Sequence, residues 1–250
     1  MKKKRRGYSR YFIMLLLAIG IFTGISYGIK TLICHMPLFT IKKVIITGNE
    51  NLEKEFLHNL VSDLIGRNLF IVNRQTIATK FANLIRVKKV RVTRLIPASL
   101  RVHVEERKAF FYIRSLQGNL YPVDDELLVL DRDSFYPGEI VPVIDTNLNE
   151  NEMVTGARIE SEFIYRVSDF CDQIKVIDPE FLNRISEFYA VGSDIYMVDN
   201  EKGFRIVFGK DGYKDKYCRF SFLEKNRNFD QDDVVDLRFT DRLIVRTEGI

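Results

Sequence analysis

The sequence contains no tryptophan, and its 250 residues include only three cysteines and three histidines. An exported domain held together by disulfides normally carries an even and denser set of cysteines. We therefore expect Cys34, Cys171 and Cys218 to be free thiols, buried in the case of the last two, with one Cys171–Cys218 bridge as the alternative. The histidines are too far apart in the sequence to suggest a shared metal site, so no metal is expected.

Motifs of the common exported enzymes are also missing from the sequence. There is no Ser-x-x-Lys, no Gly-x-Ser-x-Gly and no His-Glu-x-x-His. The acidic turn at residues 124–126 offers three carboxylates, but consecutive residues do not converge on one site, which favours a solvated loop. We therefore predict that the protein is not an enzyme, has no catalytic residue and needs no cofactor.

Acidic residues are absent from the first 30 positions, which carry seven basic ones. The whole chain has a net charge of +4, so the part after residue 30 has a net charge of −3. A mildly acidic chain of this kind lacks the electrostatic footprint of a nucleic-acid-binding protein. The basic pI of 8.8 therefore reflects the N-terminal head and does not indicate nucleic acid as a partner.

An uncharged apolar stretch covers residues 11–29. As a helix it spans roughly 28 Å at about 1.5 Å per residue, close to the thickness of a bilayer core. The residues expected to set its orientation are Lys2, Lys3, Lys4, Arg5 and Arg6. Because they precede the stretch, the positive-inside rule predicts a cytoplasmic tail at 1–10, a transmembrane helix at 11–29 and an exported remainder. The alternative is a cleaved signal peptide, which the length of the apolar run and the lack of an Ala-x-Ala site disfavour.

Within this stretch, three glycines recur every fourth residue, at Gly20, Gly24 and Gly28. Glycines at this spacing lie on one face of a membrane helix and let a second helix approach closely. The alternative is that glycine is simply frequent in membrane helices. The spacing predicts a helix-packing face.

After a linker at residues 30–38, the pattern predicts a small mixed module at 39–113. Residues 39–47 are rich in β-branched side chains and indicate a strand. Apolar residues then recur at helical spacing in two segments, with Asn51 and Asn73 as N-caps. Two alternating strands follow, around Val90 and Val102. The order strand–helix–helix–strand–strand predicts a small sheet with both helices on one face.

Residues 114–250 indicate a second, mainly antiparallel β domain with flanking helices. Pro142 suggests that the strand at 140–144 lies at a sheet edge. The acidic, Asn-rich stretch at 146–159 is expected to be a loop. Strands are expected at 120–130 (two short ones), 140–144, 185–188, 195–198, 204–208, 234–239 and 243–246, and helices at 159–174 and 213–225. The fold class is therefore α+β.

The module at 39–113 resembles a POTRA domain, in the version found in the bacterial division proteins FtsQ and DivIB. The residues that carry the resemblance are Phe39-Thr40-Ile41-Lys42-Lys43-Val44, Thr47-Gly48-Asn49, Gly66-Arg67-Asn68-Leu69-Phe70 and the segment from Pro97 to Arg107. The second half resembles the β domain of the same family, above all in Val235-Asp236-Leu237-Arg238-Phe239. The stretch at 146–159 departs from that pattern.

The resemblance implies that the end of the β domain binds FtsB, accompanied by FtsL. Arg238 would pair with an acidic group of the partner and Phe239 would pack on an apolar one. The alternative is that Asp236 and Arg238 form a structural ion pair and Phe239 is core. The expected partner-binding residues are Asp236, Arg238, Phe239, Leu243 and Val245. Leu243 to Arg246 would lie at an open sheet edge.

The resulting prediction is a non-enzymatic scaffold of the divisome that links FtsB/FtsL-like bitopic proteins to septal peptidoglycan synthesis. It would cross the bacterial inner membrane once, with its bulk in the periplasm, and gather at the division septum. The alternative is a POTRA-bearing accessory of secretion or envelope assembly.

Overall fold

The computed structural model describes residues 7–132 and 141–247, and these divide into two compact units, Met1–Glu106 and Arg107–Ile250. The basic residues expected to set the membrane orientation, Lys2 to Arg6, lie outside the described residues.

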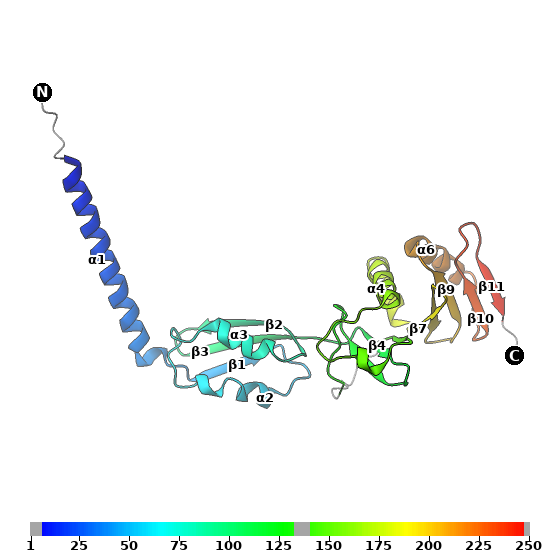
Figure 1. The fold of residues 1–250 in the computed structure, drawn as a ribbon, viewed down its shortest axis with the longest axis horizontal. Coiled ribbons are helices and arrows are strands. Elements are labelled where there is room, and N and C mark those ends of the chain that lie inside the picture. The colour runs from blue at the N-terminus through cyan, green and yellow to red at the C-terminus, as the bar shows by residue number, and fades with distance from the viewer. Residues whose placement is uncertain (1–6, 133–140, 248–250) are drawn as a thin grey trace, which may run out of the picture. The chain divides into compact units, whose positions relative to one another are not determined.

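The first unit begins with helix α1, Gly7–His35 (Figure 1). An 18-residue window within its segment Tyr11–His35 has a mean hydropathy of 2.2 and no buried residue, and within the described residues α1 is the one helix long and apolar enough to cross a membrane. The linker expected to begin at residue 30 is therefore helical as far as His35. The helix continues because nothing at Lys30 or Thr31 breaks it, and the Thr31 hydroxyl donates to the carbonyl of Tyr27.

A small module with a three-stranded sheet follows in the first unit. Its elements are β1 (Lys43–Thr47), α2 (Lys54–Asn59), α3 (Arg74–Ala82), β2 (Val87–Leu95) and β3 (Ser99–Glu106). The sheet order is β1-β3-β2, with β1 parallel and β2 antiparallel to β3. The three strands and the helices α2 and α3 enclose one apolar core, in which Leu57, Phe81 and Leu100 are fully buried.

The helix caps show where local sequence decided the structure. Asn73 caps α3 as expected, because its side chain accepts from the backbone of Gln75 at 2.9 Å. The expected cap at Asn51 was wrong: α2 begins at Lys54. The backbone N–H groups of Glu50, Asn51 and Leu52 instead donate to the buried carboxylate of Glu106, from the end of β3.

The second unit contains an eight-stranded sheet with the order β11-β10-β9-β8-β7-β6-β4-β5. Its strands are β4 (Phe111–Arg114), β5 (Leu120–Val123), β6 (Val143–Asp145), β7 (Ile185–Val191), β8 (Asp194–Asp199), β9 (Arg205–Gly209), β10 (Asp233–Asp236) and β11 (Ile244–Thr247). Its helices are α4 (Glu162–Lys175), α5 (Pro179–Asn183) and α6 (Tyr213–Glu224). Four strand pairs are antiparallel (β4–β5, β7–β8, β8–β9, β10–β11) and three are parallel (β4–β6, β6–β7, β9–β10), so the sheet is mixed.

Two expectations about this sheet were wrong. The strand after Pro142 is not at an edge, because β6 lies between β4 and β7. Proline is tolerated there since it precedes the strand, and its carbonyl accepts from the backbone of Tyr112 at 3.0 Å. The residues that the sequence placed at the end of the first module, up to 113, include β4, which pairs with β5 and β6 in the second sheet.

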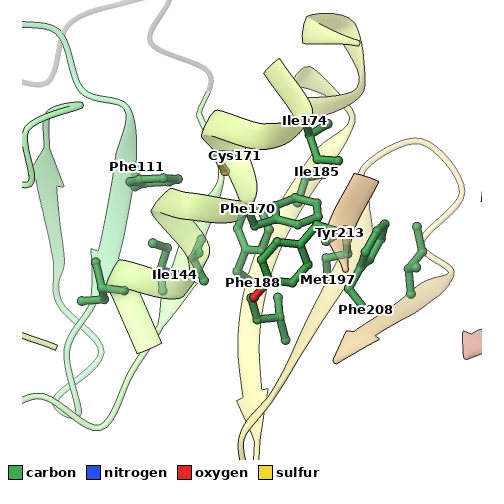
Figure 2. Packing of buried hydrophobic residues seen from close by; sticks show 14 of the residues in the cluster. Phe111, Ile144, Phe170, Cys171, Ile174, Ile185, Phe188, Met197, Phe208 and Tyr213 are labelled. Atoms are coloured by element: carbon green, nitrogen blue, oxygen red, sulfur yellow. The ribbon is translucent and has the colours of Figure 1, made fainter. Parts of the chain in front are cut away.

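The core of the second unit lies where α4 and α6 cover one face of the sheet (Figure 2). Phe170 of α4 is fully buried at its centre. Its ring meets the rings of Phe188, Phe208 and Tyr213 edge-on, with centroids 5.8, 4.9 and 5.3 Å away. Such edge-to-face contacts add to the burial of apolar area, so this cluster anchors α4 and α6 to the sheet.

The three cysteines are free thiols. Cys171 is buried in α4, next to Phe170, and burial raises the pKa of its thiol above the ordinary range. The expectation that Cys218 is buried was wrong: it lies on the exposed side of α6. The half-buried Cys34 lies inside α1.

Candidate protein-interaction edge

The two edges of the second sheet differ in whether another segment covers them. Beyond β5, Val123 bridges to Val129, and the backbone of Leu130 donates to the carbonyl of Pro122 at 2.8 Å. Beyond β11, no described segment pairs with the strand. An uncovered edge presents a row of backbone donors and acceptors to another chain. The β11 edge is therefore the candidate interaction site.

Strand β11 is held in place on its inner side by β10 and by the core. Asp233 pairs with Thr247 and Val235 with Val245 in the antiparallel register. Leu243 and Val245 are half-buried and pack against the core, which fixes the register of the strand. The edge is thus a preformed strand whose outer side no segment of residues 7–132 or 141–247 covers.

A charged network joins β10 to β8 through Arg238. Its guanidinium donates from Nη2 to Asp236 Oδ2 at 2.6 Å and from Nη1 to Asp194 Oδ2 at 2.9 Å. The carboxylate of Asp236 is buried, and Arg246 of β11 lies 3.6 Å from it. The alternative of a structural ion pair between Asp236 and Arg238 therefore describes the observed contact. Arg238 remains 37% exposed, so its outer side can still meet a partner.

The electrostatics of the edge follow from these contacts. Burial opposes ionisation of Asp236, but the hydrogen bonds and charge of Arg238 outweigh it and hold the pKa of this carboxyl below its usual range. The pKa of Asp233 is also lowered, chiefly because the Thr247 hydroxyl donates to it at 2.8 Å. Hydrogen bonds to Asp236 and to Asp194 raise the pKa of Arg238. All three groups are therefore charged at neutral pH.

Phe239 lies on the turn between β10 and β11 and is 37% exposed, so it is not a core residue. The guanidinium carbon of Arg242 stands 5.3 Å from its ring centroid. Arg219 of α6 donates to the carbonyls of Phe239 and Thr240, which ties the turn to the helix. The sequence pattern gave no reason to single out Asp194 or Arg219, since both are far from the Val235–Phe239 segment in the chain.

The remaining expected sites lie elsewhere. Gly20, Gly24 and Gly28 lie in α1, and a Cβ added at any of them would meet no atom within 4 Å. The acidic turn is less solvated than expected, because Asp124 is buried and pairs with Arg107. Its Oδ1 accepts from the backbone of Glu126 and Leu128, which makes it a structural turn. In residues 7–132 and 141–247, no three His, Cys, Asp or Glu residues are grouped as metal ligands.

The lowered pKa of the buried Asp236 carboxyl predicts that the stability of the fold depends on pH. A carboxyl whose pKa is lowered in the folded state stabilises the fold at pH values above its unfolded-state pKa of about 3.9. This contribution disappears as the pH falls through the folded-state pKa. Asp236→Asn is expected to cost about 1–3 kcal/mol at pH 7 and to show a smaller loss of Tm between pH 5 and pH 2 than the wild type. Thermal unfolding of the full chain in detergent measures both.

Asp241→Asn is the matched control, because Asp241 is 78% exposed and its pair with Arg242 is 3.8 Å long. It should leave the pH profile of Tm unchanged. An Asp236→Asn profile parallel to that of the wild type would contradict the assignment.

Comparisons with known proteins agree with this architecture. Residues 39–107 match the family model of the FtsQ-type POTRA domain. The chain is 28% identical over 111 residues to the cell division protein DivIB of Clostridium botulinum (strain Hall), a match that covers 44% of this chain and 41% of the relative. It is 24% identical over 214 residues to DivIB of Clostridium tetani, which covers 77% of this chain and 80% of the relative.

An apolar N-terminal helix followed directly by a POTRA module defines a class, the single-pass POTRA proteins. Within that class, the chain is similar to the FtsQ/DivIB family, through the FtsQ-type module at residues 39–107 and through the matches to DivIB proteins. The resemblance inferred from the sequence is thereby confirmed. The match spans about two fifths of the length of the C. botulinum relatives.

Proposed function

We propose that the protein acts in bacterial cell division as a non-enzymatic, membrane-anchored scaffold. Three relatives that match it bear the name cell division protein DivIB. The single observation that carries the proposal is the open β11 edge next to the Val235–Phe239 segment, in a chain similar to this family. An edge strand suits a protein whose task is to hold a partner chain.

The partner we propose is an FtsB-like bitopic protein accompanied by an FtsL-like one. An extended segment of the partner would add as a strand outside β11 and gain affinity from main-chain hydrogen bonds. The half-exposed Phe239 would pack on an apolar side chain of the partner. Arg238 would meet an acidic group with the part of its guanidinium that Asp236 and Asp194 leave free.

The membrane helix would contribute to the same contact. Gly20, Gly24 and Gly28 form a strip along α1 without side chains, which allows a partner's membrane helix to approach closely. With the basic head in the cytoplasm, the POTRA module and the second unit would lie on the far side of the inner membrane. There the protein would connect its partners to septal peptidoglycan synthesis at the division site.

Site-specific photocrosslinking in growing cells tests the proposed edge. A photoreactive amino acid in place of Arg246, exposed on β11, is expected to give an adduct with the FtsB-like protein. The same amino acid in place of Leu120, on β5 at the opposite edge of the sheet, should give none. Gly24→Leu in the Arg246 variant should lower the yield if the helices also meet.

Depleting the native protein in the same strain tests the proposed role in cell division. Depleted cells are expected to form filaments without septa, and the Arg246 variant should restore septation. Normal septation after depletion would refute the role. Equal adducts from both positions would refute the edge. Association with an outer-membrane barrel would favour a role in secretion or envelope assembly instead.

A further inference from the structure

The sheet of the POTRA module has one covered face and one uncovered face. Val44, Val102 and Val92 point into the core beneath α2 and α3. Because side chains alternate along each strand, their neighbours point to the opposite face. That face carries Lys43 of β1, Lys89 and Arg91 of β2, and Arg101 and His103 of β3, all of them exposed. We call these five residues the basic sheet face.

The strand register brings these residues together. Arg91 pairs with His103, and His103 pairs in turn with Thr47. Arg101 lies between Ile45 and Thr93 in the next row. Side chains opposite each other on one face lie about 4.5–5.5 Å apart at Cβ, and diagonal neighbours about 7–8 Å. The face is therefore a contiguous patch of positive charge from three strands.

The basic residues on this face outnumber the acidic ones. Lys43, Lys89, Arg91 and Arg101 form no salt bridge with any residue in the described ranges, although Asp63 on the helical side pairs with both Arg67 and Lys80. Glu105, opposite Lys89, is the acidic residue on this face. Like charges on one sheet face repel each other, so the patch destabilises the free module slightly. An anionic surface would remove that cost.

The charge is also unevenly divided along the chain. Residues 39–107 contain thirteen basic and six acidic residues, a net charge of +7. Residues 108–250 contain eighteen basic and twenty-eight acidic residues, a net charge of −10. The overall value of +4 hides this division, as did the net charge of −3 for the exported part taken as a whole. The basic character belongs to the module next to the membrane helix.

The tether between the membrane helix and this face is short. Helix α1 ends at His35 and β1 begins at Lys43. Eight residues reach at most about 28 Å when fully extended, at about 3.5 Å per residue. The tether is therefore short enough for the module to lay this face against the bilayer surface. Basic groups near an anionic membrane are attracted to it over about one Debye length, roughly 8 Å at physiological salt.

We propose that the basic sheet face binds anionic phospholipid headgroups of the membrane in which α1 is anchored. Lys43, Lys89, Arg91 and Arg101 contact headgroup phosphates, and the uncovered sheet lies against the bilayer surface. This contact restricts how the exported part is presented to its partners. It is separate from the β11 edge and does not depend on which partner that edge binds.

The test uses the full chain in lipid nanodiscs, one chain per disc, with either phosphatidylcholine alone or 30% phosphatidylglycerol. A fluorophore is attached at Thr93→Cys, beside Arg101, in a Cys34→Ser/Cys218→Ser background in which Cys171 stays buried. Lipids with a quencher on the headgroup report proximity. Quenching is expected to be at least about twofold stronger with phosphatidylglycerol and to fall as salt is raised.

Two double variants separate the face from the overall charge of the module. Arg91→Gln/Arg101→Gln is expected to remove most of the additional quenching. Lys54→Gln/Arg74→Gln removes the same charge from exposed positions on α2 and α3 and should leave quenching intact. Circular dichroism checks that both variants are folded.

Three outcomes would overturn the proposal: equal quenching in the two lipids, quenching that survives Arg91→Gln/Arg101→Gln, or equal losses in the two double variants. A fourth outcome would also overturn it: the protein forms dimers in detergent, only Arg91→Gln/Arg101→Gln dissociates them, and quenching is weak in both lipids. That result would assign the face to the acidic second unit of another copy.

Discussion

Phe170→Ala is expected to lower the free energy of unfolding of the second unit by about 3–5 kcal/mol. Phe170 is fully buried and touches the rings of Phe188, Phe208 and Tyr213. Truncation removes its apolar burial, and three surrounding elements (β7, β9 and α6) cannot collapse together into the space. Because the loss is a large part of the usual stability of a domain, the unit should be unfolded or nearly so at 37 °C.

Urea unfolding of the full chain in detergent, followed by near-ultraviolet circular dichroism, measures this loss. Phe222→Ala is the matched control: Phe222 also lies on a helix of this unit, α6, but it is 72% exposed. Its truncation should change stability by no more than about 0.5 kcal/mol. A loss below about 1 kcal/mol for Phe170→Ala would contradict the central position assigned to this ring.

Gly48→Ala is expected to have the largest effect in the POTRA module. Gly48 has a φ of +84°, and a Cβ there would overlap the carbonyl oxygen of Val104 in β3 and lie 2.7 Å from His103 Cε1. The left-handed conformation alone costs a non-glycine residue about 1–2 kcal/mol. Moving the backbone of β3 to relieve the overlap adds a further loss, so about 3 kcal/mol or more is expected in total.

Gly66→Ala separates the two causes. Gly66 has nearly the same φ, +87°, but no atom lies within 4 Å of the added Cβ. It should therefore show only the conformational cost, about 1–2 kcal/mol. Both variants are made in the full chain. Thermal unfolding and hydrogen exchange of the β3 amides then measure how much more stability Gly48→Ala loses than Gly66→Ala. Equal losses would mean that contact with β3 does not matter.

Local patterns predicted the elements well where the cause was itself local. Asn73 caps α3 because its side chain reaches the backbone two residues on. Alternating apolar residues placed β2 and β3, since one face of each strand must be buried. The cap at Asn51 failed because a distant carboxylate, that of Glu106, takes the backbone donors of the preceding turn.

At the candidate edge too, the sequence predicted some features, and others depended on residues distant in the chain. The sequence predicted that Leu243 to Arg246 would lie at a sheet edge, and β11 is the last strand of the sheet. It did not predict that Arg238 would be engaged by Asp194, which is 44 positions away in the chain. Pro142 suggested an edge strand, but β6 became internal because strands distant in sequence pair on both of its sides.

The sequence by itself determined the long apolar helix, the order of elements in the POTRA module and the resemblance to FtsQ/DivIB proteins. These depend on residue type, spacing and short-range contacts, which the linear order of the chain carries. Only the tertiary structure decided which sheet edge stays open, that Asp236 is buried against Arg238, and that four basic residues from three strands form one face. These features depend on strand order and register, which long-range pairing and burial of the core select.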